Sequence, residues 1–245
     1  MAELLHYPAV DSTNDEVIRL AQNGAPDGTW VVADEQTAGR GRRGRPWQSA
    51  KGNLFCTGLL RLAPGEGPVS QLSFLIALAL FDTLSQWVDA DRLKLKWPND
   101  VLLDGRKVSG ILLESASSGH REDRWVAAGV GVNLAFYPEN MERPAISLKA
   151  AGIAPPQPMA VAERLAAAVE HWRGRWRASG REGGFDALRT AWLARATGLG
   201  KRIEVRLPEE TLHGAFVDLA PDGALLLQLE GGAVKTIHSG DVFGI

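Results

Sequence analysis

Four arginines and three glycines make up the seven residues from Gly39 to Arg45, inside the stretch QTAGRGRRGRPW. Glycine lets the main chain approach a ligand closely and turn its N–H groups toward it. Arginine binds a carboxylate or phosphate through two parallel hydrogen bonds. The pattern predicts a loop that closes over an anion such as a nucleotide or a carboxylic acid. A solvated basic loop and an RNA-contacting segment remain open, whereas a phosphate loop is disfavoured because no Lys-Ser/Thr pair follows.

The segment KWPND, from Lys96 to Asp100, is a second candidate for chemistry. Lys96 is suited to contact a phosphate, and Asp100 at a strand end offers oxygen ligands to Mg²⁺. Taken alone, Asn99 and Asp100 are also ordinary turn residues. This segment indicates a functional site only in combination with the other motifs.

Three further stretches carry polar groups at the ends of expected strands or helices. Lys107, in GRKVSGILLE, follows a turn, and Gly110 in the same strand permits close backbone approach. Asn133 ends GVGVN, which lacks the third glycine of a dinucleotide fingerprint but leaves an amide able to read an adenine edge. Ser12 and Thr13 each have an acid three residues later, which predicts a capped helix start. A solvent-exposed lysine and a plain helix cap remain alternatives.

The surrounding pattern predicts an α+β domain with a mixed sheet, residues 1–198, followed by a small all-β domain, residues 199–245. We expect helices over 11–24, 72–88 and 159–177 and in FDALRTAWLARA, the second of them amphipathic. We expect strands in TWVVADEQT, NLFCTGLLRL, LKLKWPNDVLLDGRKVSGILLES and RWVAAGVGVNL, with DGRK as a hairpin turn. After 198, turns at Asp222-Gly223 and Gly231-Gly232 separate short apolar strands.

Composition narrows the classes of function. The chain of 245 residues is 45% apolar and carries a net charge of -2, which disfavours non-specific nucleic-acid binding. The single cysteine, Cys56, lies in an apolar run and reads as a core residue, and the five scattered histidines disfavour a zinc site. With no signal peptide and no membrane span, we expect a cytoplasmic protein.

The motifs DSTND, QTAGRGRRGRPW, KWPNDVLLDGRKVSGILLE and GVGVN occur in the order and spacing of the biotin–protein ligase family, which the chain resembles over nearly its whole length. The resemblance implies a catalytic domain similar to class II aminoacyl-tRNA synthetases, with a mixed β-sheet flanked by helices, and an SH3-like C-terminal β-barrel containing HSGDV. It implies ATP-dependent activation of biotin to biotinyl-5′-AMP, with Mg²⁺, and transfer to a lysine. The implied acceptor is the biotin carboxyl carrier domain of acetyl-CoA carboxylase or a related carboxylase.

The resemblance also implies a role for each matching residue. Lys107 would reach the biotin carboxylate and the α-phosphate. Arg40 and Arg42, with the backbone of Gly39 and Gly41, would hold the carboxylate and retain the adenylate. The other expected ligand-binding residues are Ser12, Thr13, Asn14 and Gln36 around the biotin ureido ring, Trp47 and Asn133 at the adenine, Gly110 in the Lys107 strand, and Lys96 and Asp100 as helpers for phosphate, Mg²⁺ and the acceptor lysine.

The position of the DSTND motif carries one more expectation. Family members that double as repressors have an N-terminal helix-turn-helix domain, whereas here the motif begins at residue 11. The sequence therefore predicts a monofunctional ligase that does not bind DNA or membranes, with monomer and homodimer both open. A lipoate or octanoate transferase and a biotin sensor without transfer activity are the main rivals.

Overall fold

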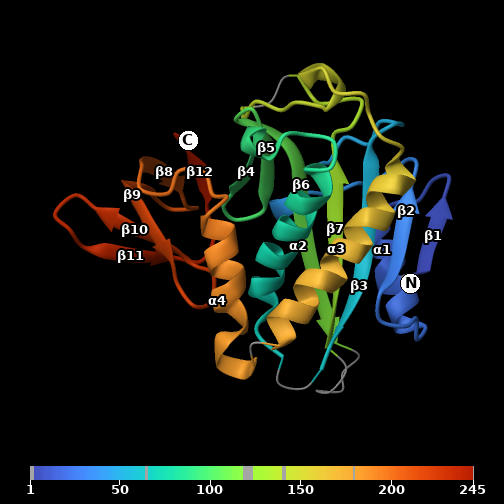
Figure 1. The fold of residues 1–245 in the computed structure, drawn as a ribbon, viewed down its shortest axis with the longest axis horizontal. Helices are drawn as coiled ribbons and strands as arrows, with labels where there is room; N and C mark the ends of the chain where they lie inside the picture. Colours follow the sequence, from blue (N-terminus) through green and yellow to red (C-terminus); the bar gives the residue numbers. More distant parts are fainter. Residues whose placement is uncertain (1–2, 64–65, 118–123, 140–141, 179, 245) are drawn as a thin grey trace.

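Two β-sheets organise the chain, a larger one in the longer N-terminal part and a smaller one at the C-terminus (Figure 1). This computed structural model describes residues 3–63, 66–117, 124–139, 142–178 and 180–244. Within these ranges no helix is long and apolar enough to span a membrane. The predicted α+β architecture followed by a β unit is confirmed.

Seven strands form the larger sheet in the order β1-β2-β3-β7-β6-β5-β4. Their bounds are β1 Glu3–Tyr7, β2 Thr29–Ala33, β3 Leu54–Leu62, β4 Leu93–Lys96, β5 Asp100–Leu103, β6 Arg106–Ser117 and β7 Arg124–Val132. β1 and β2 run parallel and the remaining neighbours antiparallel, so the sheet is mixed, as predicted. Asp104 and Gly105 both have positive φ in the expected β5–β6 hairpin. The edge strand β1 is too short for its pattern to predict it.

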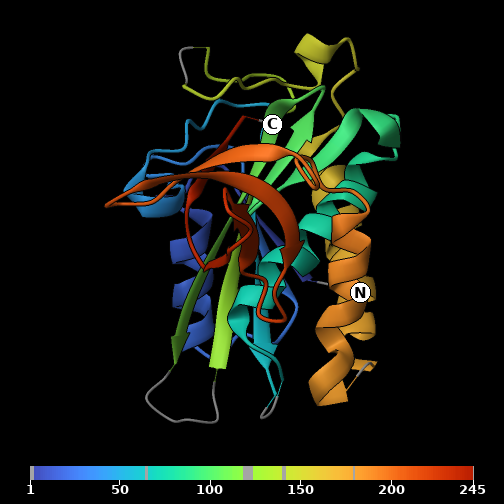
Figure 2. The same cartoon turned by 90° about the vertical axis from the view of Figure 1, so that its left-hand side faces the viewer.

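Helices cover both faces of this sheet. They are α1 Thr13–Gln22, α2 Val69–Leu84, α3 Pro158–Ala178 and α4 Gly180–Leu193. α1 packs on one face, against β2, β3 and β7, while α2 and α3 pack on the other (Figure 2). α1 covers only part of its face, and the cavity described below opens on the remainder.

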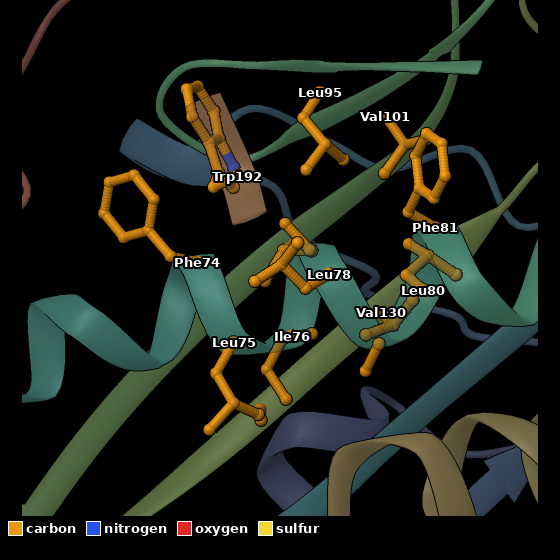
Figure 3. Close-up of a cluster of buried hydrophobic side chains, with 14 of the residues drawn as sticks. Phe74, Leu75, Ile76, Leu78, Leu80, Phe81, Leu95, Val101, Val130 and Trp192 are labelled. Atoms are coloured by element: carbon orange, nitrogen blue, oxygen red, sulfur yellow. The ribbon is translucent and has the colours of Figure 1, made fainter. Parts of the chain in front are cut away.

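The helix α2 differs from the amphipathic helix that its spacing predicts. Nearly all its residues from Gln71 to Leu84 are buried, because α3 and α4 cover the face turned away from the sheet. Figure 3 shows its side chains pointing in several directions, with Phe74 directed toward Trp192 of α4. The two rings meet edge to face with centroids 5.3 Å apart. A helix that is apolar all round belongs in a core, which explains this position.

The C-terminal unit is a five-stranded antiparallel sheet in the order β11-β10-β9-β8-β12. Its strands are β8 Arg202–Arg206, β9 Thr211–Leu219, β10 Leu225–Leu229, β11 Val234–Ile237 and β12 Asp241–Phe243. Gly223, Gly231 and Gly232 have positive φ in the turns that the sequence predicts. The unit packs on the larger one: Trp97 Nε1 donates to the Gly223 carbonyl at 3.1 Å. This packing brings β12 to the mouth of the cavity.

Candidate active site

A cavity of about 460 Å³ lies on the α1 face of the larger sheet. Its walls are the N-terminus of α1, the Gly/Arg loop (residues 39–45), strands β6 and β7, and one residue of the C-terminal unit, Asp241. The predicted site residues that line it are Ser12, Thr13, Asn14, Gln36, Arg40, Gly41, Arg42, Trp47, Asp100, Lys107, Gly110 and Asn133. Gly39 and Lys96 lie outside its lining. The fold therefore gathers nearly all the candidate residues around one space.

Most side chains at one end of the cavity are uncharged and are joined by hydrogen bonds. The buried Thr57 hydroxyl lies 2.8 Å from Thr13 Oγ1 and 2.7 Å from Asn14 Oδ1. The Thr13 hydroxyl donates to Gln36 Oε1 at 3.1 Å, and Asn14 Nδ2 donates to Glu114 Oε2 at 2.7 Å. These bonds fix the orientation of each polar group before any ligand arrives.

The start of α1 differs in detail from the predicted capping box. Ser12 occupies the N-cap position, but its hydroxyl makes no capping bond. Instead, Gln36 Oε1 accepts the Thr13 backbone N–H at 2.9 Å. A residue 23 positions away thus satisfies the free N–H group that helix ends leave. The Ser12 side chain is buried at the cavity wall rather than used by the helix.

Three glycines on two neighbouring strands form the cavity floor. Gly110 of β6 and Gly131 of β7 are partners in register, and Gly129 lies two residues before Gly131. A Cβ at Gly131 would lie 2.5 Å from Cε2 of Trp47, and one at Gly129 would lie 2.2 Å from Oδ1 of Asn14. The floor therefore depends on missing side chains, and the Trp47 indole rests on it with Nε1 buried and unpaired.

Gly129 and Gly131 are functional candidates that the sequence interpretation missed. They stand in the GVGVN stretch, whose pattern lacks the third glycine of a dinucleotide fingerprint and predicts a role for Asn133 alone. Glycines two apart on a strand place two bare positions on the same face of a sheet. That spacing was the available signal for a floor that something approaches closely.

Charged groups form the opposite end of the cavity. Lys107 Nζ lies 2.6 Å from Asp100 Oδ1 and 5.5 Å from the centre of the Trp47 ring. The β5–β6 hairpin produces this pair, since Asp100 and Lys107 stand near each other on adjacent strands. Asp100 is 4% exposed, so the pair lies in a partly dry environment where charge interactions are strong.

Two further cations have lowered pKa values: Arg42, which lines the cavity, and Lys96, which lies near Asp100 and Lys107 but outside the lining. Burial is the main reason that the pKa of Lys96 falls to about 8, followed by the charge of Arg143. Burial also lowers the pKa of Arg42, helped by Arg43, and Arg42 Nη1 donates to Asn99 Oδ1 at 3.3 Å. Both cations therefore gain when an anion binds beside them.

Arg40 lies in the cavity wall but has partners of its own. Its guanidinium forms two hydrogen bonds to the Asp15 carboxylate, at 2.6 and 2.7 Å, and reaches Glu114 at 3.5 Å. This bidentate contact joins the start of the Gly/Arg loop to α1. In this arrangement Arg40 anchors the loop, and the direct ligand contact that the sequence predicts for it stays a prediction.

Arg143 and Asp241 line the cavity although neither was predicted to be there. Arg143 Nη2 lies 3.0 Å from Asp241 Oδ1, and its guanidinium stacks 4.5 Å from the centre of the Phe243 ring. Arg143 lies outside the motifs and Asp241 lies in HSGDV, and their contact joins residues 98 positions apart (143 against 241). No local pattern signals such a pair.

The described residues offer little to bind a metal ion on their own. Within them, no group of three or more His, Cys, Asp or Glu side chains is arranged to hold one. Asp100 supplies a single carboxylate, and that carboxylate is already paired with Lys107. Since Mg²⁺ is often held by one or two carboxylates plus substrate phosphates, the site fits an ion that arrives with ATP rather than a resident one.

Comparison with protein families gives two matches. Residues 7–133 match the model of the biotin/lipoate A/B protein ligase family, and residues 198–243 match the biotin protein ligase C-terminal domain. The biotin–[acetyl-CoA-carboxylase] ligase of Paracoccus denitrificans is 43% identical over 95% of this chain and 97% of its own. The bifunctional ligase/repressor of Bacillus subtilis is 32% identical over 98% of this chain and 73% of its own.

A solved structure shares the whole arrangement. The biotin protein ligase of Aquifex aeolicus in complex with biotin and ATP superimposes with a TM-score of 0.79, at 28% identity, over 99% of this chain and 98% of that one. Both β-sheet units fall within this match. The similarity therefore extends to the placement of the C-terminal unit beside the cavity.

Proposed function

Because the chain belongs to the biotin/lipoate A/B protein ligase family, we propose that it joins biotin to ATP, forming biotinyl-5′-AMP and pyrophosphate, and then transfers the biotinyl group to a lysine of a carrier protein. The observation that carries this proposal is the polarity of the cavity. One end offers fixed, uncharged hydrogen-bonding groups, and the other offers cations. A ligand with a neutral ring system at one end and an anion at the other matches this arrangement.

The first step brings two anions together. A biotin carboxylate oxygen attacks the α-phosphorus of ATP, the new O–P bond forms, and the bond to the bridging oxygen breaks to release pyrophosphate. Fixed positive charge offsets the repulsion and stabilises charge that develops at phosphorus. Lys107 and Arg42 supply this charge, since both side chains line the charged end. Lys107 is paired with Asp100, and Arg42 donates to the neutral side chain of Asn99.

The uncharged end binds the biotin ureido ring. That ring needs both hydrogen-bond donors and acceptors, which Ser12, Thr13 and Gln36 provide at the wall. The Trp47 indole rests on the glycine floor in this structure, so it must lift away before ligand rings can lie against the bare backbone. Trp47 then covers the ligand, and its unpaired Nε1 becomes a donor toward it.

Transfer needs a neutral acceptor amine. The amine attacks the carbonyl carbon of the mixed anhydride, AMP leaves, and the amine proton must go to a base. Asp100 lies beside Lys107 at the reacting end, so it is placed to accept that proton. When ATP is bound, Mg²⁺ supplies charge neutralisation at its phosphates. We propose the carboxyl carrier domain of acetyl-CoA carboxylase as the acceptor, on the strength of the Paracoccus relative.

The test is biotin-dependent exchange of labelled pyrophosphate into ATP by the purified protein with Mg²⁺ and no acceptor. Lipoate and octanoate replace biotin in parallel, because the matched family covers biotin and lipoate ligases and octanoate is the acyl chain of lipoate without its sulfur atoms. We expect exchange with biotin alone. Exchange with lipoate or octanoate instead would assign the protein to the sister activity, and no exchange from folded protein would contradict adenylation altogether.

A further inference from the structure

One carboxylate of the C-terminal unit forms ion pairs with three arginines at the mouth of the cavity. Asp241 Oδ2 lies 2.6 Å from Arg45 Nη2 and 3.4 Å from Arg43 Nη1, while its Oδ1 lies 3.0 Å from Arg143 Nη2. Arg43 and Arg45 belong to the Gly/Arg loop. Asp241 therefore forms both ion pairs between the C-terminal unit and the outer half of the loop, and Ser239 Oγ adds a hydrogen bond from Arg43 at 3.5 Å.

Asp241 is a well-fixed group rather than a mobile surface acid. It begins β12, where it pairs with Arg206 of β8, and its side chain is 14% exposed. Phe243, two residues on, lies between the guanidinium groups of Arg143 and Arg206, at 4.5 and 3.9 Å from its ring centre. Burial by itself raises the pKa of Asp241, but the arginines outweigh it and the pKa is lowered, so the group is ionised at neutral pH.

Besides Asp241, the outer half of the loop is held by a long hydrogen bond from Arg43 Nη2 to Ser239 Oγ, at 3.5 Å, and by a backbone bond from Gly41 N–H to the Arg45 carbonyl, at 2.7 Å. Arg43, Gly44, Arg45 and Pro46 are exposed, and Arg43 has a φ of 58°, in the left-handed region that a non-glycine residue rarely adopts. Such a conformation persists only when neighbouring contacts impose it. The inner half is already anchored by Arg40 on Asp15. Between the two anchors stands Arg42, and just beyond them Trp47 covers the glycine floor.

We propose that Asp241 is a positioning residue that holds the Gly/Arg loop closed and thereby keeps biotinyl-5′-AMP in the cavity until the acceptor arrives. The C-terminal unit would then contribute to retention of the intermediate without contacting it. The inference rests on the proposed function, since retention requires an adenylate to retain. Its mechanical part, a loop latched by Asp241, does not depend on any ligand.

The main experiment compares Asp241→Asn with Asp218→Asn. Asp218 also belongs to the C-terminal unit and forms an ion pair across to Arg189 of α4, but it does not touch the loop. Adenylate is formed on each protein from labelled ATP and biotin, and its release is followed after a chase. We expect release from Asp241→Asn to be about tenfold faster, roughly 1.4 kcal/mol, with Asp218→Asn within about twofold of wild type.

A rescue and a binding comparison separate positioning from a general loss of structure. Asp241→Glu keeps the charge and should recover much of the retention. The affinity of Asp241→Asn for biotin alone, measured by calorimetry, should stay within about twofold of wild type, because the ion pairs of Asp241 are with Arg43, Arg45 and Arg143 and not with the residues of the uncharged end. If biotin affinity, thermal stability and retention all fall together, or if Asp241→Asn retains adenylate like wild type, the proposal is wrong.

Limited trypsin digestion without substrates tests the latch itself. Arginines in the loop are cleavage sites, and a released loop is cut faster. We expect faster cleavage within residues 40–45 in Asp241→Asn and in Arg45→Gln, but not in Asp218→Asn. If the wild type fails to exchange pyrophosphate yet this pattern appears, the proposed function fails and the latch stands. Unchanged cleavage overturns the latch whatever the exchange assay gives.

Discussion

The two ends of the cavity differ in how far their polar groups are already paired without a ligand. At the uncharged end, Thr13, Asn14 and Thr57 already satisfy one another, so little remains to be reorganised when a ligand binds. The charged end keeps an excess of cations. The basic residues that line it are Arg42, Arg45, Lys107 and Arg143, and the acidic ones are Asp100, Glu142 and Asp241. Lys96 lies outside the lining but close enough to Asp100 and Lys107 for their charges to act on its pKa. The polar groups of the uncharged end are hydrogen-bonded without a ligand, whereas the charged end has excess positive charge that a bound anion would balance.

The two ends also differ in which parts of the chain build them. The uncharged end comes from the first unit alone, from α1, β3 and the segment that follows β2. The charged end needs the β5–β6 hairpin, the Gly/Arg loop and Asp241 of the C-terminal unit. We infer that biotin recognition belongs to one unit and that ATP chemistry depends on both.

Lys107→Ala is expected to give the largest difference between the effect on adenylation and the effect on biotin binding. Removal of this ammonium takes away a charge at the reacting end, and loss of such a group costs roughly 10²–10³ in rate. Pyrophosphate exchange should fall by at least that factor, while biotin affinity by calorimetry stays within about threefold. Equal losses in both measurements would show that the ends are not separable.

Arg42→Gly should affect retention more than formation of the adenylate. The variant removes a half-buried cation from the middle of the closed loop, so the adenylate should escape about a hundredfold faster, near 2.7 kcal/mol. The escaped intermediate would label nearby proteins indiscriminately, which a blot of an added bystander protein detects. A variant that holds its adenylate as tightly as wild type would contradict this account of the loop.

Lys96→Met should stabilise the protein while it lowers activity. With a folded-state pKa of about 8 against 10.5, the unfolded chain binds more protons between these values, so the ammonium penalises the folded state below pH 8. Removing it should raise the free energy of unfolding at pH 7 by about 3 kcal/mol. The gain should shrink as pH rises from 8 to 10.5, as urea unfolding at several pH values would reveal. A difference in unfolding free energy between Lys96→Met and wild type that does not change with pH would contradict the lowered pKa of Lys96.

The smallest effect is expected at the uncharged end, from Thr57→Val. This near-isosteric change removes the hydroxyl that contacts Thr13 and Asn14, a loss of about 1 kcal/mol. Biotin affinity should fall several-fold with no change in the KM for ATP, the reverse of Lys107→Ala. An increase in the KM for ATP of similar size would show that the ends are coupled.

The parts of the site that could be predicted from sequence are those where neighbouring residues carry the chemistry. The Gly/Arg loop, Lys107 and Gln36 stand inside contiguous motifs, and the fold brings them to one cavity. Asp241 and Arg45 are 196 positions apart, and their contact exists only because the C-terminal unit packs beside the loop. Local patterns carry no information about such a pair.

The same distinction explains the misses in the fold. The spacing in α2 correctly predicts a helix but does not show that α3 and α4 cover its second face, since that depends on tertiary packing. At the start of α1, the sequence places a serine where a cap belongs, yet Gln36 reaches in from a distant segment and caps the helix instead. Local propensity was overridden by a tertiary contact in both cases.

A crystal structure with a non-hydrolysable analogue of biotinyl-5′-AMP would test the two-ended cavity most directly. We expect the ureido ring among Ser12, Thr13 and Gln36, the linkage that replaces the phosphate beside Lys107 and Arg42, and Trp47 covering the ligand. An analogue bound in the opposite direction, or with its phosphate mimic away from both cations, would contradict the central claim.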